Sequence, residues 1–458
     1  MAQTVQPDSE SPAAAAPLPL RANTTQTFAR ANWSQFNFNP GKPKGPLASV
    51  GKSLQDLGIN VRIPVWWQFM DNVTEGAAGA HGRMGSGTWF LPVIDFDLDK
   101  MFGLKDTRIR TMEEIHVLKL HGGGGADGFQ SAAASGPFGT QHRLLKEPNT
   151  FTQLSIDHLM FDKRLDVEVG RMNAKRYFFG GYCDVNLLSC NNLVLERNAG
   201  LPPSAFSTWM GRAAWNFTPH LYVQGAIEEL DPHANSTRGF DFGTNHANAT
   251  GGGFISLGEI AYKTNFRSTA YPLEIEAGGW KNTASHADPL NSKLFTKGTS
   301  AFQLDINKTV WRQDGGASRD PLVRHLNVYT QFGKAMDPTS VYDTQVAVGT
   351  SLYAPFASRP HDIVGAKVTY LRLTSHERGF LQASQFGAGG ANEFHAVSTY
   401  FELNYHIQLY PDVVLEPVAQ YVLHPDTLFN AKVKSVQSGW VLGFTLVMDI
   451  SRLAGLGG

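Results

Sequence analysis

Apolar and polar residues alternate with a period of two along most of the chain, from about Gly58 to Ile450. In the segment LYVQGAIE, residues 221–228, the odd positions hold leucine, valine, glycine and isoleucine, and the even positions include glutamine and glutamate. A period of two is that of a β-strand, whose successive side chains point to opposite faces. The pattern therefore predicts one strand after another, each with an apolar face and a charged face.

The predicted strands differ from those of a soluble β-sandwich. Sandwich strands usually extend over about five or six residues and pack their apolar faces against a second sheet. Here many alternating segments are longer, with aromatic residues near their ends, and their polar faces carry carboxylates and arginines at mid-strand. This arrangement is typical of a membrane barrel that has an apolar outer band and a water-filled lumen. A large soluble all-β enzyme is the alternative interpretation.

The alternating segments number sixteen, and an even number is what a single-chain bacterial barrel requires. They start near Gly58, Thr88, Arg108, Phe151, Leu165, Thr208, Leu221, Phe254, Leu273, Ser300, Val323, Thr344, Asp362, Ala396, Val413 and Gly439. Short connections alternate with long ones, which include residues 122–150, 172–207, 231–252 and 375–395. We therefore predict a sixteen-stranded antiparallel transmembrane β-barrel with short periplasmic turns and long extracellular loops. The loops 122–150 and 172–207 are expected to fold partly into the mouth of the pore.

The barrel is expected to occupy residues 51–450, between a mobile Ala- and Pro-rich segment at 1–50 and a short tail at 451–458. One helical turn is predicted for residues 53–57. No apolar run reaches the roughly 18–20 residues that a spanning helix needs. The start lacks the basic region and apolar stretch of a signal peptide, which fits a cytosolic protein or an exported one whose leader was removed. The predicted membrane barrel favours an exported protein whose leader was removed, located in the outer membrane of a Gram-negative-type bacterium.

The composition excludes several other classes of protein. Among 458 residues, 39 Lys and Arg balance 40 Asp and Glu, which leaves a formal net charge of −1. A chain without a basic excess is a poor binder of bulk nucleic acid. With 46 glycines, 11% aromatic residues and 17% charged residues, the chain is typical of an ordered, turn-rich protein rather than a disordered or coiled-coil one.

Cys183 and Cys190 are the two cysteines, seven positions apart in a Gly-, Asn- and Leu-rich stretch. A local disulfide is the simplest pairing, because no other cysteine competes for either of them. Two free thiols and a metal site are the alternatives, although zinc would require CxxC-like spacing and histidine partners. A disulfide would indicate the periplasm, the outer membrane or the exterior.

Several motifs, in this order along the chain, resemble those of the carbohydrate-selective outer-membrane porin family. The segment LMFDKRLDVEVGRMN, residues 159–173, consists of a strand, a short Asp-containing turn and a strand that ends Gly-Arg-x-Asn. Further matches are STWMGR at 207–212, TPH at 218–220, LYVQG at 221–225, LDP at 230–232, GEIAY at 258–262, YAPF at 353–356, RPHD at 359–362, LEPVAQY at 415–421 and HP at 424–425. Barrels of this kind commonly finish on an aromatic residue, whereas SRLAGLGG at 451–458 follows the last strand here.

The resemblance covers roughly residues 55–450 and implies both fold and function. It implies a sixteen-stranded monomeric barrel through which monosaccharides or related polyols diffuse passively, with a pore narrowed by infolded loops and a cysteine pair in the loop after residue 173. The implied partners are small carbohydrates and the surrounding outer-membrane lipid and lipopolysaccharide, with no cofactor and no nucleic acid. A general diffusion pore, a barrel enzyme of the lipase or protease type, and a structural barrel or adhesin are the alternatives.

The candidate binding residues follow from the chemistry of sugars. A sugar is neutral and densely hydroxylated and has apolar C–H faces, so a selective site needs donors, acceptors and an aromatic surface. Arginine offers a fixed fork of donors, and a nearby carboxylate offers acceptors while it neutralises the field. The predicted pore-lining residues are the donors Arg62, Arg110 and Arg212, the acceptors Glu114, Asp157, Glu168, Glu228 and Glu259, and the stacking surfaces Trp66 and Trp280. Structural Arg–Glu rungs and interfacial tryptophans are the alternative interpretations.

Arg171 does not fit the simple pattern. By strict alternation from Val169 it faces lipid, where a charged side chain is costly. Either Gly170 marks a β-bulge or the strand has already left the membrane at this point.

No metal or catalytic centre is predicted. The fifteen histidines are scattered, without the H-E-x-x-H spacing of a zinc site, and no G-x-S-x-G elbow is present. Asp95, Asp97 and Asp99 alternate on one predicted strand and are expected to line the lumen wall rather than bind calcium. The four glycines at 122–125 lack the following helix of a phosphate-binding loop, and a flexible or infolded loop is expected there.

Overall fold

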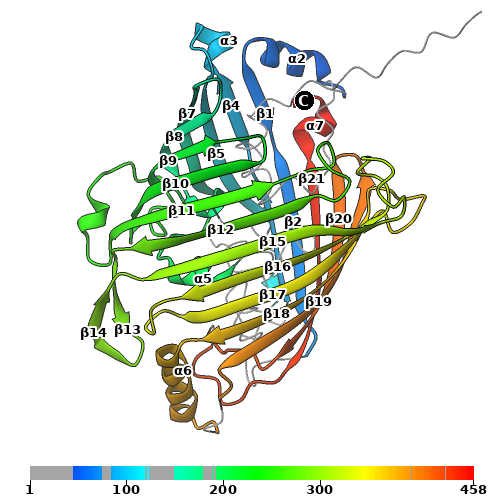
Figure 1. Ribbon diagram of the computed structural model, residues 1–458. Coiled ribbons are helices and arrows are strands. Elements are labelled where there is room, and N and C mark those ends of the chain that lie inside the picture. The colour runs from blue at the N-terminus through cyan, green and yellow to red at the C-terminus, as the bar shows by residue number, and fades with distance from the viewer. Residues whose placement is uncertain are drawn as a thin grey trace, which may run out of the picture.

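The chain folds into one closed antiparallel β-barrel (Figure 1). The computed structural model describes residues 45–74, 84–118, 121–122, 149–178, 189, 192–391, 394–428 and 430–457. The strands of the barrel sheet are β1 (Ile59–Arg62), β2 (Pro64–Asn72), β3 (Met84–Phe90), β4 (Val93–Asp97), β5 (Thr107–Leu118), β6 (His121–Gly122), β7 (Asn149–Met160), β8 (Leu165–Met172), β9 (Thr208–Asn216), β10 (Leu221–Leu230), β11 (Gly253–Lys263), β12 (Leu273–Asn282), β15 (Ser300–Arg312), β16 (His325–Ala335), β17 (Tyr342–Tyr353), β18 (Ile363–Leu373), β19 (Val397–Tyr410), β20 (Val413–Leu423) and β21 (Gly439–Asp449).

These nineteen segments make sixteen barrel strands, because three strands are interrupted. β1 and β2 together form the first strand, β3 and β4 the second, and β5 and β6 the third. The barrel closes where β2 pairs with β21, from Pro64 opposite Asp449 to Asn72 opposite Val441. The sixteen-stranded antiparallel barrel predicted from the alternation is therefore confirmed.

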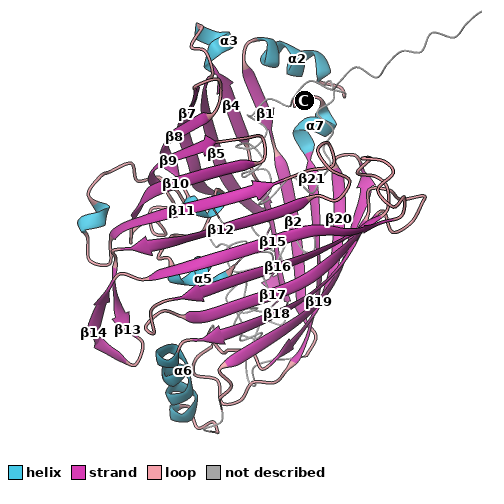
Figure 2. Cartoon of the chain, in the orientation of Figure 1, coloured by secondary structure: helices cyan, strands magenta, loops and turns pink. Residues whose placement is uncertain are grey.

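A few helices and one hairpin lie outside the barrel sheet (Figure 2). They are α2 (Ala48–Asp56), α3 (Leu98–Phe102), the 3₁₀ turn η1 (Ala174–Arg176), α5 (Leu193–Asn198), the 3₁₀ turn η2 (His246–Asn248), α6 (Ser375–Gly387), α7 (Ile450–Ala454) and the hairpin of β13 (Ser285–Asp288) and β14 (Asn291–Lys297). Within the described part of the chain, every helix is too short or too polar to span a bilayer.

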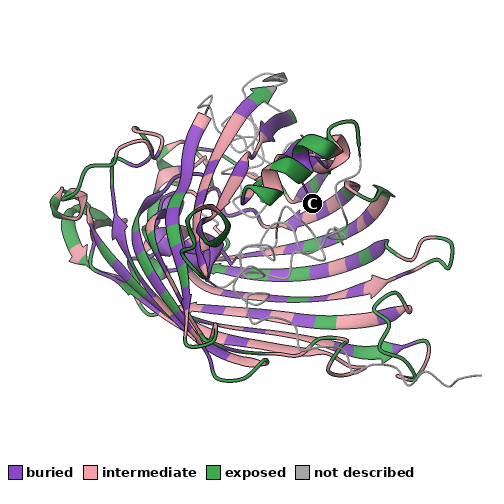
Figure 3. Ribbon diagram, turned by 90° about the horizontal axis from the view of Figure 1, so that it is seen from above, coloured by how far each residue is buried: buried purple, intermediate pink, exposed green. Residues whose placement is uncertain are grey.

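The apolar face of each strand points outward. On β11, Ile260 and Tyr262 are 49% and 42% exposed, whereas their neighbours Glu259 and Ala261 are 5% and 1% exposed. Buried and exposed residues alternate in the same way along the other strands (Figure 3). A soluble barrel would bury its apolar face, so the exposed apolar band is the surface that lipid would cover.

The connections at the two ends of the barrel differ in length. One end, here called the short-turn end, carries the connections 98–106, 161–164, 217–220, 264–272, 313–324, 354–362 and 411–412. The other, the long-loop end, carries among others 173–207, 231–252, 283–299, 374–396 and 424–438. The alternation has one break, because the long-loop connection 336–341 is shorter than the short-turn connection 313–324.

Two helices flank the barrel seam at the short-turn end. The predicted turn at 53–57 is part of the longer helix α2, and the tail after the last strand begins as α7. The amide of Leu47 donates to the carbonyl of Ala454 at 2.8 Å, so the start of α2 lies against the end of α7. Residues 1–44 lie outside the described residues, and the mobile N-terminal segment stays a prediction.

The expectation that Asp95, Asp97 and Asp99 share one strand face is wrong for Asp99, which lies in α3. Asp95 and Asp97 both belong to β4, in register with the inward Arg110 and Arg108, and Asp95 pairs with Arg110. Asp97 ends the strand and caps α3, since its carboxylate accepts from the amides of Asp99 and Lys100. Aspartate is a strong N-cap residue, and this local preference ends the alternation.

The described residues of the connection 173–207 fill part of the lumen at the long-loop end. Its buried residues Phe178, Val194 and Leu195 belong to an apolar cluster with the inner wall. The wall residues of this cluster include Met70, Trp280, Tyr342, Leu371, Tyr400, Val418 and Val441. The inner wall is thus polar at mid-barrel but apolar where this connection packs against it.

Candidate functional site

The inner wall from β4 to β11 carries a continuous set of hydrogen-bonded polar side chains, here called the lumen network. Its members are Asp95, Arg108, Arg110, Gln153, Asp157, Asp166, Glu168, Arg212, Gln224 and Glu259. They come from the inward positions of adjacent strands, and register brings them together: Asp95 lies opposite Arg110, and Asp157 opposite both Arg108 and Glu168. The alternation of each strand therefore builds the network.

One part of the lumen network faces the open lumen. Arg110 donates to both carboxylate oxygens of Asp95, at 2.6 and 2.8 Å. Arg108 donates to Asp157 at 2.5 Å and lies 3.7 Å from Asp95. The side chains of Arg108 and Asp95 are 17% and 19% exposed. These two side chains can contact a solute directly.

The other part of the network is buried. Arg212 donates to Asp166 at 3.1 Å and to the Oε1 atom of Gln224 at 2.9 Å. The Nε2 atom of Gln224 in turn donates to Glu259 at 2.8 Å. The side chains of Arg212 and Asp166 are only 2% and 3% exposed. Arg212 therefore supports the wall and does not present its guanidinium to the lumen.

Tyr177 covers the buried part from the connection 173–207. Its ring lies 5.1 Å from the guanidinium carbon of Arg212, and its hydroxyl donates to Glu168 at 3.1 Å. Gln153 donates to the Tyr177 hydroxyl at 2.7 Å. Burial, together with the nearby Glu168 carboxylate, raises the pKa of Tyr177 well above its usual value, so the hydroxyl keeps its proton.

Two predicted acceptors hold this connection in place. The carboxylate of Glu228 accepts from the amide of Ala174 at 2.7 Å and from Thr208 at 2.5 Å. The carboxylate of Glu114 accepts from Arg176 at 3.0 Å. Glu114 and Glu228 therefore lie on the lumen side as predicted, but their contacts are those of loop anchors.

Asn198, at the end of α5, anchors the connection to the opposite wall. Its side-chain amide donates to the carbonyl of Tyr342 at 2.7 Å and accepts from the amides of Val341 and Tyr342, both at 3.1 Å. Nearby, the ammonium of Lys367 donates to the carbonyl of Ser189 at 2.6 Å. The connection thus crosses the lumen from β8 to β17 and β18.

The two predicted stacking residues are buried. Trp66 faces the lumen as predicted, but it is 2% exposed and stacks on Trp89, with ring centroids 5.7 Å apart. Trp280 is 4% exposed and belongs to the apolar cluster around the infolded connection. Neither indole offers an open face to a sugar in this structure.

Arg62 is a more exposed donor than the other two, and its charge acts on Asp95 of the lumen network. It sits at the end of β1, and its side chain is 36% exposed. Its Nε atom donates to Asp449 at 3.4 Å, next to α7. Of the three predicted arginines, Arg110 and Arg212 belong to the lumen network, and Arg62 lies near the short-turn end.

Arg171 lies on the outer side of β8, as alternation predicts, but lipid would not reach it. It is fully buried, with its guanidinium carbon 5.8 Å from the Trp209 ring and 5.6 Å from the Phe242 ring, and it donates to the carbonyl of Ser207. The pairing of β7 with β8 shows no register shift, so Gly170 is not a bulge.

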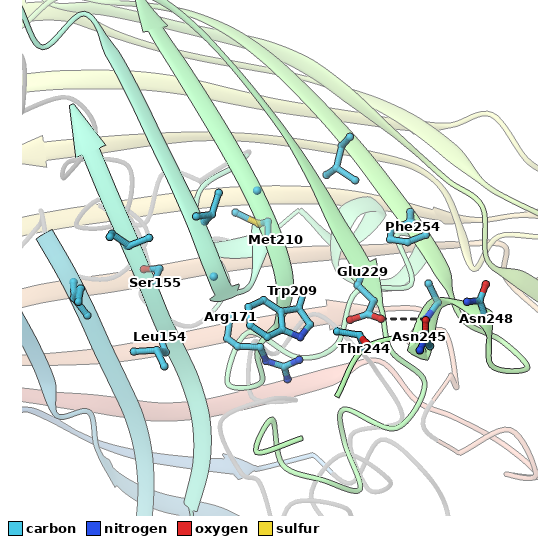
Figure 4. A pocket seen from close by; sticks show the side chains of 17 residues that line it. Leu154, Ser155, Arg171, Trp209, Met210, Glu229, Thr244, Asn245, Asn248 and Phe254 are labelled. Atoms are coloured by element: carbon cyan, nitrogen blue, oxygen red, sulfur yellow. Dashed lines mark hydrogen bonds between the residues drawn. The ribbon is translucent and has the colours of Figure 1, made fainter. Parts of the chain in front are cut away.

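Beside Arg171 lies a groove of about 840 Å³ on the outer wall (Figure 4). Its lining includes outward residues of β7 to β11 and part of the connection 231–252. Among them are Leu154, Trp209, Glu229, Asn245 and Phe254. The groove opens on the outside of the barrel, so it is not part of a path through the lumen.

Some sequence predictions fall outside the described residues. Cys183 and Cys190 are among them, so the disulfide stays a prediction. Most of the connection 122–150 is also outside, and its position in the pore mouth stays a prediction. No group of three or more metal-ligating residues occurs in the part of the chain that the structure describes.

Two carboxyls at the long-loop end should make α6 sensitive to pH. Burial raises the pKa of Glu377 from 4.5 to about 7 and that of Asp426 from 3.8 to about 6. Because both pKa values are higher in the folded protein than in the unfolded chain, the folded loops hold more protons between about pH 4 and pH 7. The stability of the folded loops is therefore greatest at acidic pH and falls as the pH rises through this range. For Glu377 alone the loss is about 3 kcal/mol.

Hydrogen exchange of the α6 amides at pH 5 and pH 8, corrected for intrinsic rates, measures this loss. We expect faster opening at pH 8 in the wild type and a smaller difference in Glu377→Gln, which carries no titrating group. An equal pH difference in both proteins would contradict the assignment to Glu377.

Sequence reasoning missed several members of the site. Arg108, Asp166 and Gln224 occupy inward positions that the alternation identifies, so they could have been found by extending the same argument. Tyr177 and Asn198 lie in a connection without any period, and no local signal marks them.

Comparisons with known proteins agree with this architecture. A family model described as carbohydrate-selective porin, OprB family, matches residues 89–448. A porin of Acinetobacter baylyi named QuiX is 23% identical over 420 residues, which cover 88% of this chain and 92% of the relative. Porin B of Pseudomonas aeruginosa is 23% identical over 297 residues, covering 61% of this chain and 63% of the relative. The high-pH structure of Pseudomonas putida OprB has a TM-score of 0.73 at 19% identity, covering 87% of this chain and 96% of that one, and so shares the fold.

Proposed function

Because the chain belongs to the carbohydrate-selective porin family, OprB, we propose that its lumen network selects small neutral carbohydrates as they diffuse passively through the barrel. The protein is a Gram-negative outer-membrane porin, and its fold is that of a transport channel. Monosaccharides and related polyols are the proposed solutes. The short-turn end would face the periplasm and the long-loop end the exterior.

The paired arginines and carboxylates of the lumen network carry this proposal. Arg108 and Asp95 offer a fixed donor fork and acceptor oxygens side by side, which match neighbouring hydroxyls of a sugar. Since each arginine is paired with a carboxylate, the field along this wall is largely neutralised, and an ion gains less from it than from an unpaired charge. A fixed, neutralised set of donors and acceptors favours a neutral polar solute.

We also infer a monomer surrounded by outer-membrane lipid and lipopolysaccharide. Exposed apolar side chains occur on strands all around the barrel. Examples are Ile227 on β10, Phe302 on β15, Val348 on β17, Phe401 on β19 and Leu442 on β21, each between 43% and 59% exposed. Among the strands that the structure describes, this apolar band supports lipid contact on every side, and the mass of the detergent-solubilised protein tests the monomer.

Planar-bilayer recordings with added sugars test the function directly. We expect open channels whose ion current falls as glucose-sized sugars enter, and liposomes that swell in the same sugars. Ion current that does not respond to any monosaccharide or polyol, beyond the effect of viscosity, would contradict sugar selection and favour a general diffusion pore.

A further inference from the structure

The hairpin of β13 and β14 carries a cationic face outside the barrel. It extends from β12 and β15 and projects beyond the wall at the long-loop end (Figure 1). Phe295 and Lys297 alternate on the regular part of β14 and therefore share one face, whereas Lys293 lies in the irregular part between Asn291 and Phe295. All three residues are exposed. Phe295 is 66% exposed.

The opposite face of the hairpin packs against the protein. The Nε2 atom of His286 lies 2.7 Å from the hydroxyl of Thr339, and Asp288 pairs with His376 of α6 at 3.0 Å. Ser285 pairs with Lys297, so Lys297 lies on the face away from these contacts. Lys297 thus points away from the loops, and Lys293 is exposed near the tip of the hairpin.

The cationic face continues along the outer rim of the barrel. Lys281 is exposed at an outward position of β12, in register with Ser300. Lys334 on β16 and Arg372 on β18 are also outward, and both lie near Asp343, at 2.5 and 3.9 Å. In the described part of the chain, no carboxylate lies within ion-pair distance of Lys281, Lys293 or Lys297.

An apolar band lies directly below this cationic rim. Phe302, 44% exposed, is the register partner of Lys334, and its ring lies 5.5 Å from that of Phe332. The positively charged side chains therefore lie within one or two residues of the apolar band along each strand. This is the arrangement expected at the depth where lipid headgroups adjoin acyl chains.

The neighbouring rim, from β8 to β11, has the opposite character. There Glu229, Asp231 and Asp241 surround Arg171, and His246 lies 3.2 Å from both aspartates. The sector from β12 to β18 thus carries an excess of positive charge, because Asp343 pairs with Lys334 and Asp288 pairs with His376. Lys432 and Lys434 are also exposed, in the connection 424–438.

We propose that this sector, with Lys281, Lys293 and Lys297 as its free cations and Phe295 between them, binds the phosphate groups of an outer-leaflet glycolipid of the lipid A type. The acyl chains of that lipid would lie on the apolar band around Phe302. The partner follows from charge complementarity, because phosphates placed above hydrocarbon match ammonium groups placed above exposed phenylalanines. The placement rests on the proposed orientation, with the long-loop end outside the cell.

Binding of purified lipid A to the full-length protein in neutral detergent tests this proposal. Native mass spectrometry measures the fraction of protein with bound lipid. The test variant is Lys281→Gln/Lys293→Gln/Lys297→Gln, and the matched control is Lys52→Gln/Lys100→Gln/Lys105→Gln, which removes the same charge at the short-turn end. We expect the test variant to bind lipid A at least tenfold more weakly and the control to bind it as the wild type does.

Dephosphorylated lipid A provides the second arm. It should bind the wild type and the test variant equally weakly, because only the phosphates distinguish them. Three results would overturn the proposal. They are an equal loss of lipid A binding in both triple variants, unchanged lipid A binding in the test variant, and equal binding of phosphorylated and dephosphorylated lipid A. Unaltered sugar block in planar bilayers shows that the test variant still folds and conducts, and separates this result from any failure of the proposed sugar function.

Discussion

Replacing Arg108 with alanine should weaken sugar binding in the pore about tenfold and destabilise the barrel less than the loss of the buried Arg212 does. Arg108 is the part of the lumen network that a solute can reach, with 17% of its side chain exposed. Hydrogen bonds to a charged group contribute about 1.5–3 kcal/mol, which corresponds to roughly tenfold or more in affinity. The sugar concentration that halves the ion current in planar bilayers measures the change.

Arg212→Ala is the contrasting variant. Its guanidinium is buried, and its removal leaves the carboxylate of Asp166 without its cation in the wall. Breaking a buried pair in this way costs about 3–5 kcal/mol, so the free energy of unfolding in urea should fall clearly for Arg212→Ala. It should fall by less for Arg108→Ala, because Arg108 is the more exposed of the two arginines. If Arg108→Ala leaves the half-blocking sugar concentration unchanged, the exposed edge of the lumen network is not the sugar contact.

Asn198→Ala should release the connection 173–207 from the wall and raise the single-channel conductance several-fold. The substitution removes three hydrogen bonds between Asn198 and the backbone of Val341 and Tyr342. Each buried group left without a partner costs about 1–3 kcal/mol, which is enough to favour positions of the connection outside the lumen. Selectivity among sugars should fall with the gain in conductance, because Tyr177 moves with the same connection.

Asn265→Ala is a suitable control for this experiment. The Asn265 side chain accepts from the amides of Arg267 and Ser268 in a connection at the short-turn end, away from the infolded segment. Its conductance should equal that of the wild type. An Asn198→Ala channel with wild-type conductance would show that the remaining contacts hold the connection without this anchor.

The strands could be predicted from the sequence because their signal is local. Each alternation occupies consecutive residues, and lipid outside and water inside impose it on every strand, so even the start of β10 at Leu221 was found. The alternation wrongly placed Asp99 on this strand, because Asp97 caps α3, and this capping preference is also local but competes with the alternation. Strand prediction thus failed where two local preferences conflicted.

The site could be predicted only in part, since contacts across the lumen join distant residues. Inward positions such as Arg110, Glu168 and Glu259 follow from the period alone. Other contacts depend on which strand or connection lies opposite a residue. Examples are the anchoring of a loop by Glu228 and the stacking of Trp66 on Trp89. No pattern along the chain encodes those distances.

The seam between β2 and β21 sets an order of events during assembly. These two strands lie at opposite ends of the sequence, and neither has its full set of backbone partners until the last strand has been delivered. Until then, both β2 and β20 present open edges on which a foreign strand can add. The folding barrel therefore carries two open edges until its final segment arrives, and pairing of that segment with both neighbours removes the two edges in a single step.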